Sequence, residues 1–130
     1  GPMRINKHDI PTVIDAPGAV ARQVEGFGEA AEPMAGEYFS LAAGTDIKPL
    51  LQGLEGDACD APHWGYLIAG TVVVSFSDGT EETCRGGDIF YWPPGHSVRV
   101  DDDAEVILFS PEAEHSAVMA HMGKALEAMA

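Results

Sequence analysis

The chain has 130 residues, of which 45% are hydrophobic, and its 21 Asp and Glu outnumber its 7 Lys and Arg to give a formal net charge of −14. This length suits one domain with a real core and is too short for two. Because the charge is strongly negative, nucleic acid and anionic membrane surfaces would be repelled, and we expect neither as a partner. The acidity itself is typical of a solubility feature.

Few features of the sequence bear on its compartment. Gly1–Pro2–Met3 resembles the remnant of a cleaved tag, and neither a signal peptide nor a bilayer-spanning apolar run is visible, so we expect a cytoplasmic location. Cys59 and Cys84 are the only cysteines. So sparse a pair predicts two reduced thiols, with a bridge between them as the alternative.

The first part of the chain lacks a sustained period. Residues 1–36 are rich in Gly, Pro, Ala and acidic residues, which predicts a tag remnant followed by an irregular arm. Within this arm, Val13–Ile14 could add a short strand, including one that pairs with another subunit.

From residue 37 the pattern changes to short β-prone runs separated by turn residues. The runs are 38–42, 47–54, 71–77, 80–84, 88–92, 96–100 and 105–109. Asp78–Gly79 is a strong hairpin signal, and the acidic run 101–103 predicts a polar turn. Strands at this spacing predict an all-β sandwich or closed barrel over residues 37–110.

The last segment, residues 111–130, predicts one C-terminal helix. Ser110 is a candidate cap, and Pro111 suits the first helical position. Val118, Met122, Leu126 and Met129 form an apolar stripe at helical spacing. We expect that stripe to pack against the barrel or a second subunit.

Candidate metal ligands lie in two clusters. Asp57, Cys59 and His63 are separated by even numbers of residues, so they share one face if the segment is extended. His96 follows a Pro-Pro-Gly turn in the second cluster. A thiolate and imidazoles can converge on a transition metal. The alternative is structural: Cys59 as a small buried hydrophobe, and the two histidines as residues that close turns.

The second cluster resembles the second signature motif of the cupins, a superfamily of jelly-roll β-barrels. Gly87, Pro93 and Gly95 match the Gly, Pro and Gly of that motif at the correct spacing. Val98 occupies the usual position of the metal ligand, and His96 lies two residues earlier on the same face of a strand. Asp102 stands where the motif has Asn.

The first signature motif matches more loosely. Gly70 fits its final glycine, His63 stands where the family has Glu, and Asp57 and Cys59 stand at the His-x-His pair. The resemblance therefore implies a small single-domain cupin whose metal site uses Cys59, His63 and His96, with Asp57 as a weaker fourth ligand.

The ligand types favour Zn(II), with Fe(II), Cu or Ni as alternatives. We expect the side chain missing at Gly65 to leave space beside the ion for water or substrate. Five residues are expected to line the pocket: Gly65, Tyr66, Leu67, Trp92 and Val98. The other histidines, His8, His115 and His121, are expected to be ordinary surface or helix residues.

The resemblance implies a metal-dependent enzyme that acts on a small organic molecule, of oxygenase, isomerase, lyase or hydrolase type. The alternatives are a non-catalytic barrel that binds a small ligand and a dimeric scaffold. We expect a homodimer, because the N-terminal arm contains apolar residues and cupin barrels commonly pair.

Overall fold

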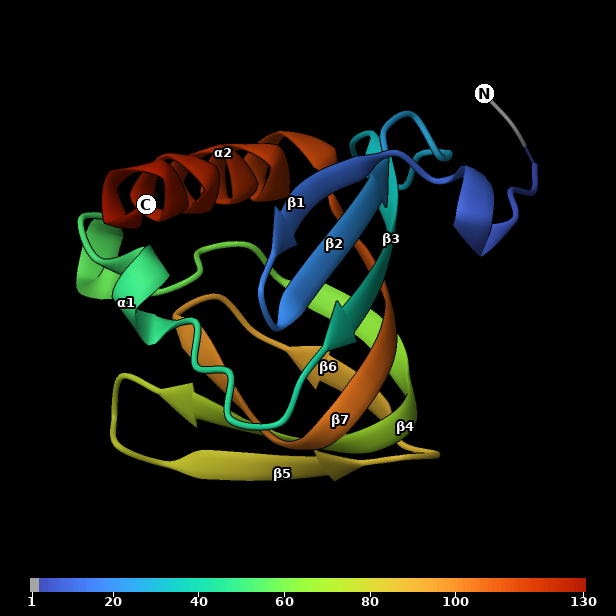
Figure 1. The fold of residues 1–130 in the computed structure, drawn as a ribbon. Coiled ribbons are helices and arrows are strands. Elements are labelled where there is room, and N and C mark those ends of the chain that lie inside the picture. Colours follow the sequence, from blue (N-terminus) through green and yellow to red (C-terminus); the bar gives the residue numbers. More distant parts are fainter. Residues whose placement is uncertain (1–2) are drawn as a thin grey trace.

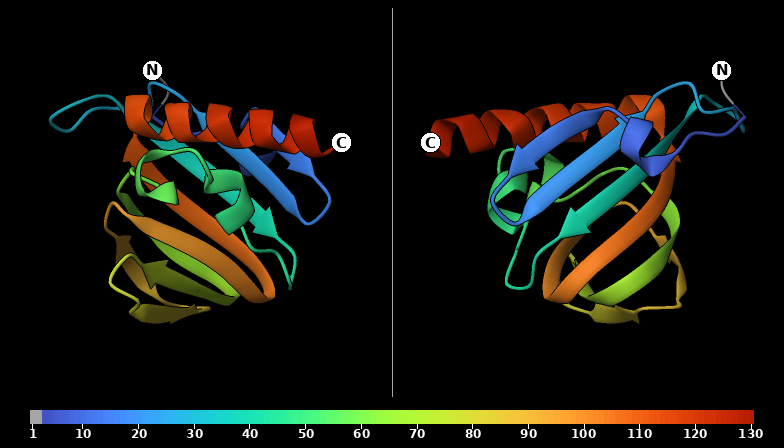
Figure 2. Two further views of the ribbon diagram at one scale, coloured as in Figure 1. Left: turned by 90° about the vertical axis from the view of Figure 1, so that its left-hand side faces the viewer. Right: turned by 45° about the vertical axis from the view of Figure 1, so that its right-hand side comes forward.

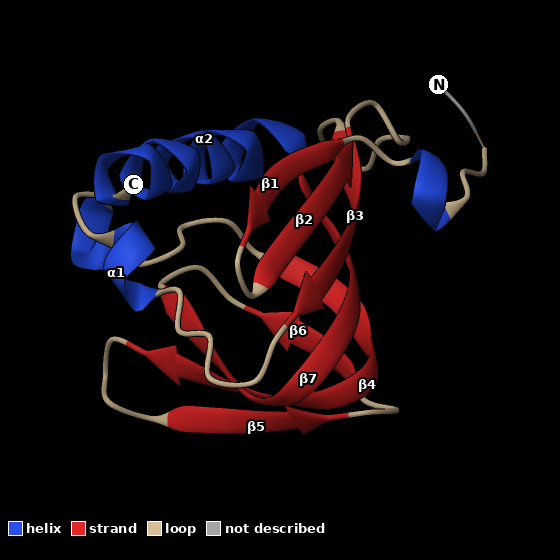
Figure 3. Ribbon diagram, in the orientation of Figure 1, coloured by secondary structure: helices blue, strands red, loops and turns tan. Residues whose placement is uncertain are grey.

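The computed structural model describes residues 3–130, which form one antiparallel seven-stranded sheet curled into a barrel with a helix at one end (Figures 1 and 3). The strands are β1 (Thr12–Ala16), β2 (Ala19–Val24), β3 (Met34–Leu41), β4 (His63–Phe76), β5 (Glu81–Arg85), β6 (Ile89–Trp92) and β7 (His96–Pro111). The α-helices are α1 (Lys48–Leu51) and α2 (Glu112–Met129), and residues 7–9 and 55–57 form 3-10 turns. The predicted all-β barrel with one C-terminal helix is confirmed.

The long strand β4 organises the barrel. Strands follow the order β1-β2-β3-β7-β4-β5, and β6 also pairs with β4. Residues 63–66 of β4 pair with β6, residues 71–75 pair with β5, and both halves pair with β7. The register shifts around Gly70, whose φ of +91° favours glycine. A Cβ there would lie 2.1 Å from the carbonyl oxygen of Asp103.

The hairpin predicted at Asp78–Gly79 is confirmed, since it joins β4 to β5. Gly79 has a φ of +86°. The Asp78 carboxylate accepts hydrogen bonds from the backbone and the hydroxyl of Thr80, at 2.9 and 2.6 Å. Local turn chemistry therefore fixes this corner, as the sequence indicates.

Two apolar clusters fill the molecule. The first lies inside the barrel and consists of Leu67, Val72, Val74, Cys84, Phe90, Trp92, Val98, Val100, Ala104, Val106 and Leu108. The second lies where α2 and α1 meet one end of the barrel, and it includes Val118 and Met122 (Figures 1 and 2). The predicted packing of the helix stripe against the barrel is thus confirmed, although Met129 is 60% exposed.

The N-terminal arm is more regular than expected. β1 and β2 form a hairpin that adds to the sheet through β3, and β3 begins at Met34, before the expected barrel boundary at residue 37. The turn uses Gly18, with a φ of +83°. In β2 the inward residues are Ala21 and Gln23, so the strand lacks the alternation of large apolar residues that marks a typical strand.

Two further local predictions are wrong. Residues 48–51 form the short helix α1 and not a strand, because Pro49 fits the first turn of a helix. The acidic run 101–103 lies inside β7 and does not form a turn. Its side chains are exposed, and the Asp103 carboxylate accepts the backbone N–H of Ala43 at 2.8 Å.

Both cysteines are buried and form no disulfide with each other, which agrees with the prediction of two separate thiols. Within residues 3–130, no helix combines the length and apolarity that a bilayer crossing requires.

Gly65→Ala should strongly destabilise the barrel. A Cβ there would lie 2.2 Å from the Ile107 carbonyl oxygen and 2.5 Å from Cζ of Phe90. We expect the free energy of unfolding to fall by roughly 3 kcal/mol or by more, since overpacking a filled core is costly. Urea denaturation measures the change.

Gly123→Ala is the matched control for this substitution. Gly123 lies within α2 and has open space around its Cα, so the same change should stabilise the protein by roughly 0.5–1 kcal/mol. If both variants unfold at the urea concentration of the parent, the close packing at Gly65 is refuted.

Candidate metal centre

The backbone brings Cys59, His63 and His96 together at one end of the barrel. Cys59 lies in the loop before β4, while His63 and His96 are the first residues of β4 and β7. Cys59 and His96 form an antiparallel bridge, in which the Cys59 N–H donates to the His96 carbonyl oxygen at 2.8 Å. The Gly95 N–H donates to the Cys59 carbonyl oxygen, also at 2.8 Å. Main-chain hydrogen bonds therefore hold this loop beside the start of β7.

The three side chains suit a shared metal ion. Their potential ligand atoms all lie within 4.8 Å of one another, and Cys59, His63 and His96 are 3%, 3% and 1% exposed. Cys59 Sγ lies 3.5 Å from His63 Nε2. Tetrahedral zinc, with bonds of about 2.3 Å to sulfur and about 2.05 Å to nitrogen, places two such atoms about 3.6 Å apart. This pair already has nearly that spacing.

A backbone carbonyl fixes the tautomer of His96. The Nδ1 atom lies 2.6 Å from the Pro93 carbonyl oxygen. A carbonyl only accepts hydrogen bonds, so Nδ1 carries the proton and Nε2 keeps a free lone pair. Neutral imidazole binds a metal in this form.

A longer chain of hydrogen bonds fixes the tautomer of His63. The Ser110 hydroxyl donates its proton to Glu37 Oε1 at 2.5 Å. Its oxygen is then the acceptor for His63 Nδ1, which lies 2.7 Å away. The free lone pair of His63 is therefore on Nε2, the atom that faces Cys59 Sγ.

Glu37 is the centre of this buried polar network. It lies on β3, and its Oε2 atom accepts hydrogen bonds from Gln23 Nε2 at 2.9 Å and from His115 Nδ1 on α2. Glu37, His63 and His115 also form a group that could hold a metal ion. Because Glu37 already accepts three hydrogen bonds, Glu37 and His115 are better suited to support His63, and Cys59, His63 and His96 remain the candidate ligands.

Burial sets the charge states of the three candidate ligands. It raises the pKa of the Cys59 thiol to about 11. Burial lowers the pKa of His63 well below its usual range, helped by His115 and His96, and it lowers the pKa of His96 to about 4. Both imidazoles are thus uncharged at neutral pH, while the thiol has to lose its proton when it binds a metal.

The predicted fourth ligand, Asp57, does not join this group. It is exposed and lies in a 3-10 turn with a φ of +51°, so the segment is not extended as the prediction assumed. The Asp57 carboxylate instead accepts the Gly53 N–H at 2.9 Å. The prediction of Asp57 as a ligand is therefore wrong.

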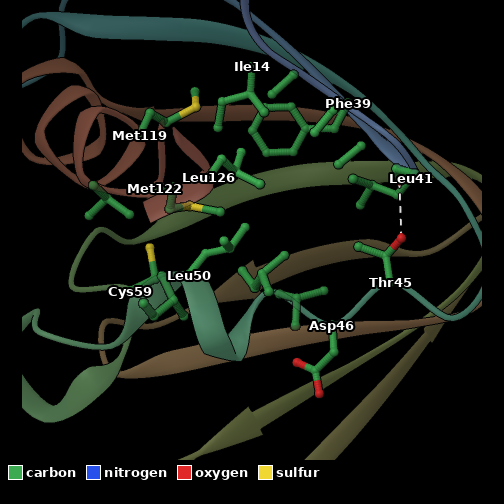
Figure 4. Close-up of a pocket in the computed structure, with 18 of the residues that line it drawn as sticks. Ile14, Phe39, Leu41, Thr45, Asp46, Leu50, Cys59, Met119, Met122 and Leu126 are labelled. Carbon is green, nitrogen blue, oxygen red and sulfur yellow. Dashed lines mark hydrogen bonds between the residues drawn. The ribbon is translucent and has the colours of Figure 1, made fainter. Parts of the chain in front are cut away.

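A cavity of about 550 Å³ reaches the candidate ligands from the space between the barrel, α1 and α2 (Figure 4). Two of the residues predicted to line the pocket do so, Trp92 and Val98. Gly65 leaves no space beside the ligands, because the Phe90 ring fills the position of its missing side chain. Leu67 is buried in the barrel core, and Tyr66 is 43% exposed.

Residue type and spacing did not identify Glu37, Ser110 and His115 as part of the site, although the sequence pattern contains signals for two of them. Ser110 follows Val106 and Leu108 at even spacing on the inward face of β7. Ser110 was instead predicted to cap α2, which begins at Glu112 without a side-chain cap. His115 lies three residues before Val118 and so belongs to the apolar stripe of α2, where a buried imidazole calls for a partner.

No protein-family model and no curated protein sequence matches this chain. Solved structures do match it. The oxalate decarboxylase from Lactobacillus farciminis, as a formate complex, aligns with a TM-score of 0.61 and 21% identity over 86% of this chain and 33% of that chain. A deletion mutant of the Bacillus subtilis oxalate decarboxylase aligns with a TM-score of 0.60 and 20% identity over 85% of this chain and 30% of that chain.

A second kind of match has a similar length. An RmlC-like cupin from Shewanella frigidimarina aligns with a TM-score of 0.58 and 16% identity, over 85% of this chain and 92% of that chain. The chain spans only about a third of the length of the two oxalate decarboxylases. These likenesses concern the fold alone, and with the barrel topology they show that the chain has the cupin fold, a jelly-roll β-barrel.

Proposed function

We propose that this protein is a metal-dependent cupin that binds a divalent transition metal through Cys59, His63 and His96 and acts on a small organic molecule. The observation that supports this most directly is the convergence of a sulfur and two imidazoles, at a spacing that suits a shared ion. Zn(II) is the favoured metal because thiolate and imidazole ligands suit it, and Fe(II), Cu and Ni are alternatives.

The residues around the proposed ligands hold protons in defined places. The Pro93 carbonyl and the Ser110 hydroxyl keep the Nδ1 protons of His96 and His63, so that both Nε2 atoms are free. Three protein ligands leave a fourth position for water or substrate, and the cavity supplies access to it. A divalent ion in such a site polarises a carbonyl or activates water. The fold supports oxygenase, isomerase, lyase and hydrolase chemistry alike.

A non-catalytic barrel that binds a small ligand is the second candidate function. The size and apolar walls of the cavity favour this second function, because binding a small ligand requires a suitable cavity and no reactive group. Turnover of a bound compound by the metal-loaded protein, absent from the metal-free protein, distinguishes the enzyme from the binding barrel.

We also propose that the protein works in the cytoplasm. The unpaired state of Cys59 and Cys84 supports this, since reducing compartments keep thiols free. Oxidation of Cys59 to a disulfide would remove the thiolate that the proposed site requires.

Removing any one proposed ligand should empty the site. We expect Cys59→Ala, His63→Ala and His96→Ala each to lower the zinc content of the purified protein at least tenfold, measured by elemental mass spectrometry, while circular dichroism shows a folded barrel. Ser110→Ala should leave a zinc site with roughly 10–100-fold lower affinity, because Ser110 orients His63 without being a ligand itself.

Two substitutions of the same kind serve as controls. Cys84→Ala removes a buried thiol of the barrel core, and His121→Ala removes an imidazole that hydrogen bonds to the Gln52 carbonyl oxygen outside the ligand group. Both variants should keep full zinc occupancy. Full occupancy in the three ligand variants as well would show the ligand assignment to be wrong.

The metal-free protein should lose stability as the pH falls from 7 to 5. The pKa of His96 is about 4 in the folded protein against 6.5 for the free side chain, so below pH 6.5 the unfolded chain binds a proton that the folded protein excludes. The free energy of unfolding should then fall by about 1.4 kcal/mol per pH unit for this residue, or about 2 kcal/mol at pH 5. His63, whose pKa is also lowered, should add a loss of the same sign.

Urea denaturation of the metal-free protein at pH 7 and pH 5 measures this loss. In His96→Gln, the loss of unfolding free energy between pH 7 and pH 5 should be smaller by about 2 kcal/mol, because glutamine binds no proton in this range. His121→Gln, at a half-buried histidine outside the ligand group, should leave this loss unchanged. An equal loss in the parent and in His96→Gln would contradict the buried neutral state of His96.

We propose that the protein is a homodimer, as expected from the sequence. An exposed apolar surface on the outside of the sheet supports this: Trp64 and Tyr91 stack with their ring centroids 5.2 Å apart, and Ile89 beside them is 85% exposed. Light scattering coupled to gel filtration should give about twice the chain mass, and Ile89→Asp should reduce it to the monomer mass. A monomeric parent protein refutes the proposal.

A further inference from the structure

The cavity above the proposed ligands has apolar walls on three sides. Phe39 and Leu41 come from the sheet, Leu50 comes from α1, and Met122 and Leu126 come from α2 (Figure 4). Methionine side chains adapt to ligands of irregular shape. At about 550 Å³, the cavity is large enough for a molecule with two or three rings.

Polar groups are confined to the two ends of this cavity. One end holds the ligand cluster together with His115, whose ring lies 4.2 Å from that of His63, and the other end holds Thr45 and Asp46. The Thr45 hydroxyl already donates to the Gly18 carbonyl oxygen at 3.1 Å, and Asp46 accepts the Lys48 N–H at 2.9 Å. The Asp46 carboxylate also points away from the apolar side chains (Figure 4). A hydroxyl-rich molecule such as a sugar would therefore lose hydrogen bonds to water without replacing them.

The side chains that line the cavity offer no permanent positive charge, so any attraction for an anion would have to come from the proposed metal ion. Among the residues that the structure describes, neither a lysine nor an arginine lines the cavity, and the chain as a whole carries a net charge of −14. A dianion such as oxalate, the compound named by two of the matching structures, would find no guanidinium or ammonium partner here. Burial of a free anion between these walls is costly.

From these observations we propose that the cavity binds a neutral, largely apolar small molecule through its walls, and that the walls themselves disfavour carboxylates, phosphates and sugars. This proposal extends the function proposed above. Any reaction of the bound molecule would take place at the proposed metal site, so that part rests on the proposed function. The binding itself depends on the walls of the cavity and is independent of the metal.

Two fluorescent probes with the same ring system test the charge preference. N-phenyl-1-naphthylamine is neutral, whereas 8-anilinonaphthalene-1-sulfonate adds one negative charge to the same rings. We expect the neutral probe to bind the full chain at least tenfold more tightly than the sulfonate. Its affinity should change less than twofold after the protein is treated with a chelator, because the walls and not the ion hold it.

Substitutions in the walls locate the bound probe. Leu50→Asp on α1 and Leu126→Asp on α2 each place a charge in the apolar lining, and each should weaken binding of the neutral probe at least tenfold. Val13→Asp, at an exposed residue on the outer face of β1 and outside the cavity lining, should leave the affinity unchanged. Circular dichroism checks that every variant is folded. Because each helix carries one wall variant, either variant can still test the proposal if the other one unfolds.

The outcomes separate this proposal from the proposed metal site. Equal or tighter binding of the sulfonate overturns the proposal, as does probe binding that survives both wall substitutions. A protein that binds the neutral probe in its cavity but never binds zinc contradicts the metal site and supports this proposal. A zinc-loaded protein that fails to bind the neutral probe supports the metal site and overturns this proposal.

Discussion

The buried carboxylate of Glu37 is the constraint on which the rest of this structure depends. A carboxylate removed from water is costly unless donors surround it, and three side chains supply those donors. Gln23 comes from β2, Ser110 from β7 and His115 from α2, while Glu37 itself lies on β3. One group thus holds the N-terminal hairpin, the barrel and the C-terminal helix together at a single point. Loss of any one of these donors leaves charge unsatisfied in the interior.

The same network determines what the proposed metal site can do. Through Ser110, Glu37 fixes which nitrogen of His63 carries the proton, and so directs the other nitrogen toward Cys59. The Pro93 carbonyl acts on His96 in the same way, with a backbone atom in place of a side chain. The sulfur and the imidazoles are therefore oriented before any ion arrives, which lowers the cost of assembling the site.

The sequence alone predicted those parts of the fold that local chemistry determines. The Asp78–Gly79 turn, the alternation in the barrel strands and the helix stripe are each set by neighbouring residues, and each is confirmed. The strand expected at Val13–Ile14 is present as β1, but its partner β2 was missed because the inward residues of β2, Ala21 and Gln23, are not large and apolar. Its strands form because β3 provides an edge with which to pair, and residues distant in sequence supply that edge.

Only part of the candidate site could be predicted from the sequence, because some of its contacts join residues that lie far apart in the chain. Cys59, His63 and His96 are indicated by residue type and spacing, and the structure brings them together. Asp57 was assigned by extending a strand pattern into a segment that turns at a positive φ. Glu37 and His115 are 78 positions apart, so no local pattern could reveal their contact. The space assigned to Gly65 was equally hidden, because the ring that fills it belongs to Phe90 on another strand.

Helix α2 is held unequally along its length, and this has a mechanical consequence. Its first turn contains His115, which is fixed to Glu37 in the interior, whereas its last turn ends at the largely exposed Met129. Leu126 and Met129, at the loosely held end, form part of the cavity wall. His121 adds a second attachment through the Gln52 carbonyl oxygen, so thermal motion should be largest in the segment after Met122, beside the cavity, and smallest in the turn that contains His115, beside His63.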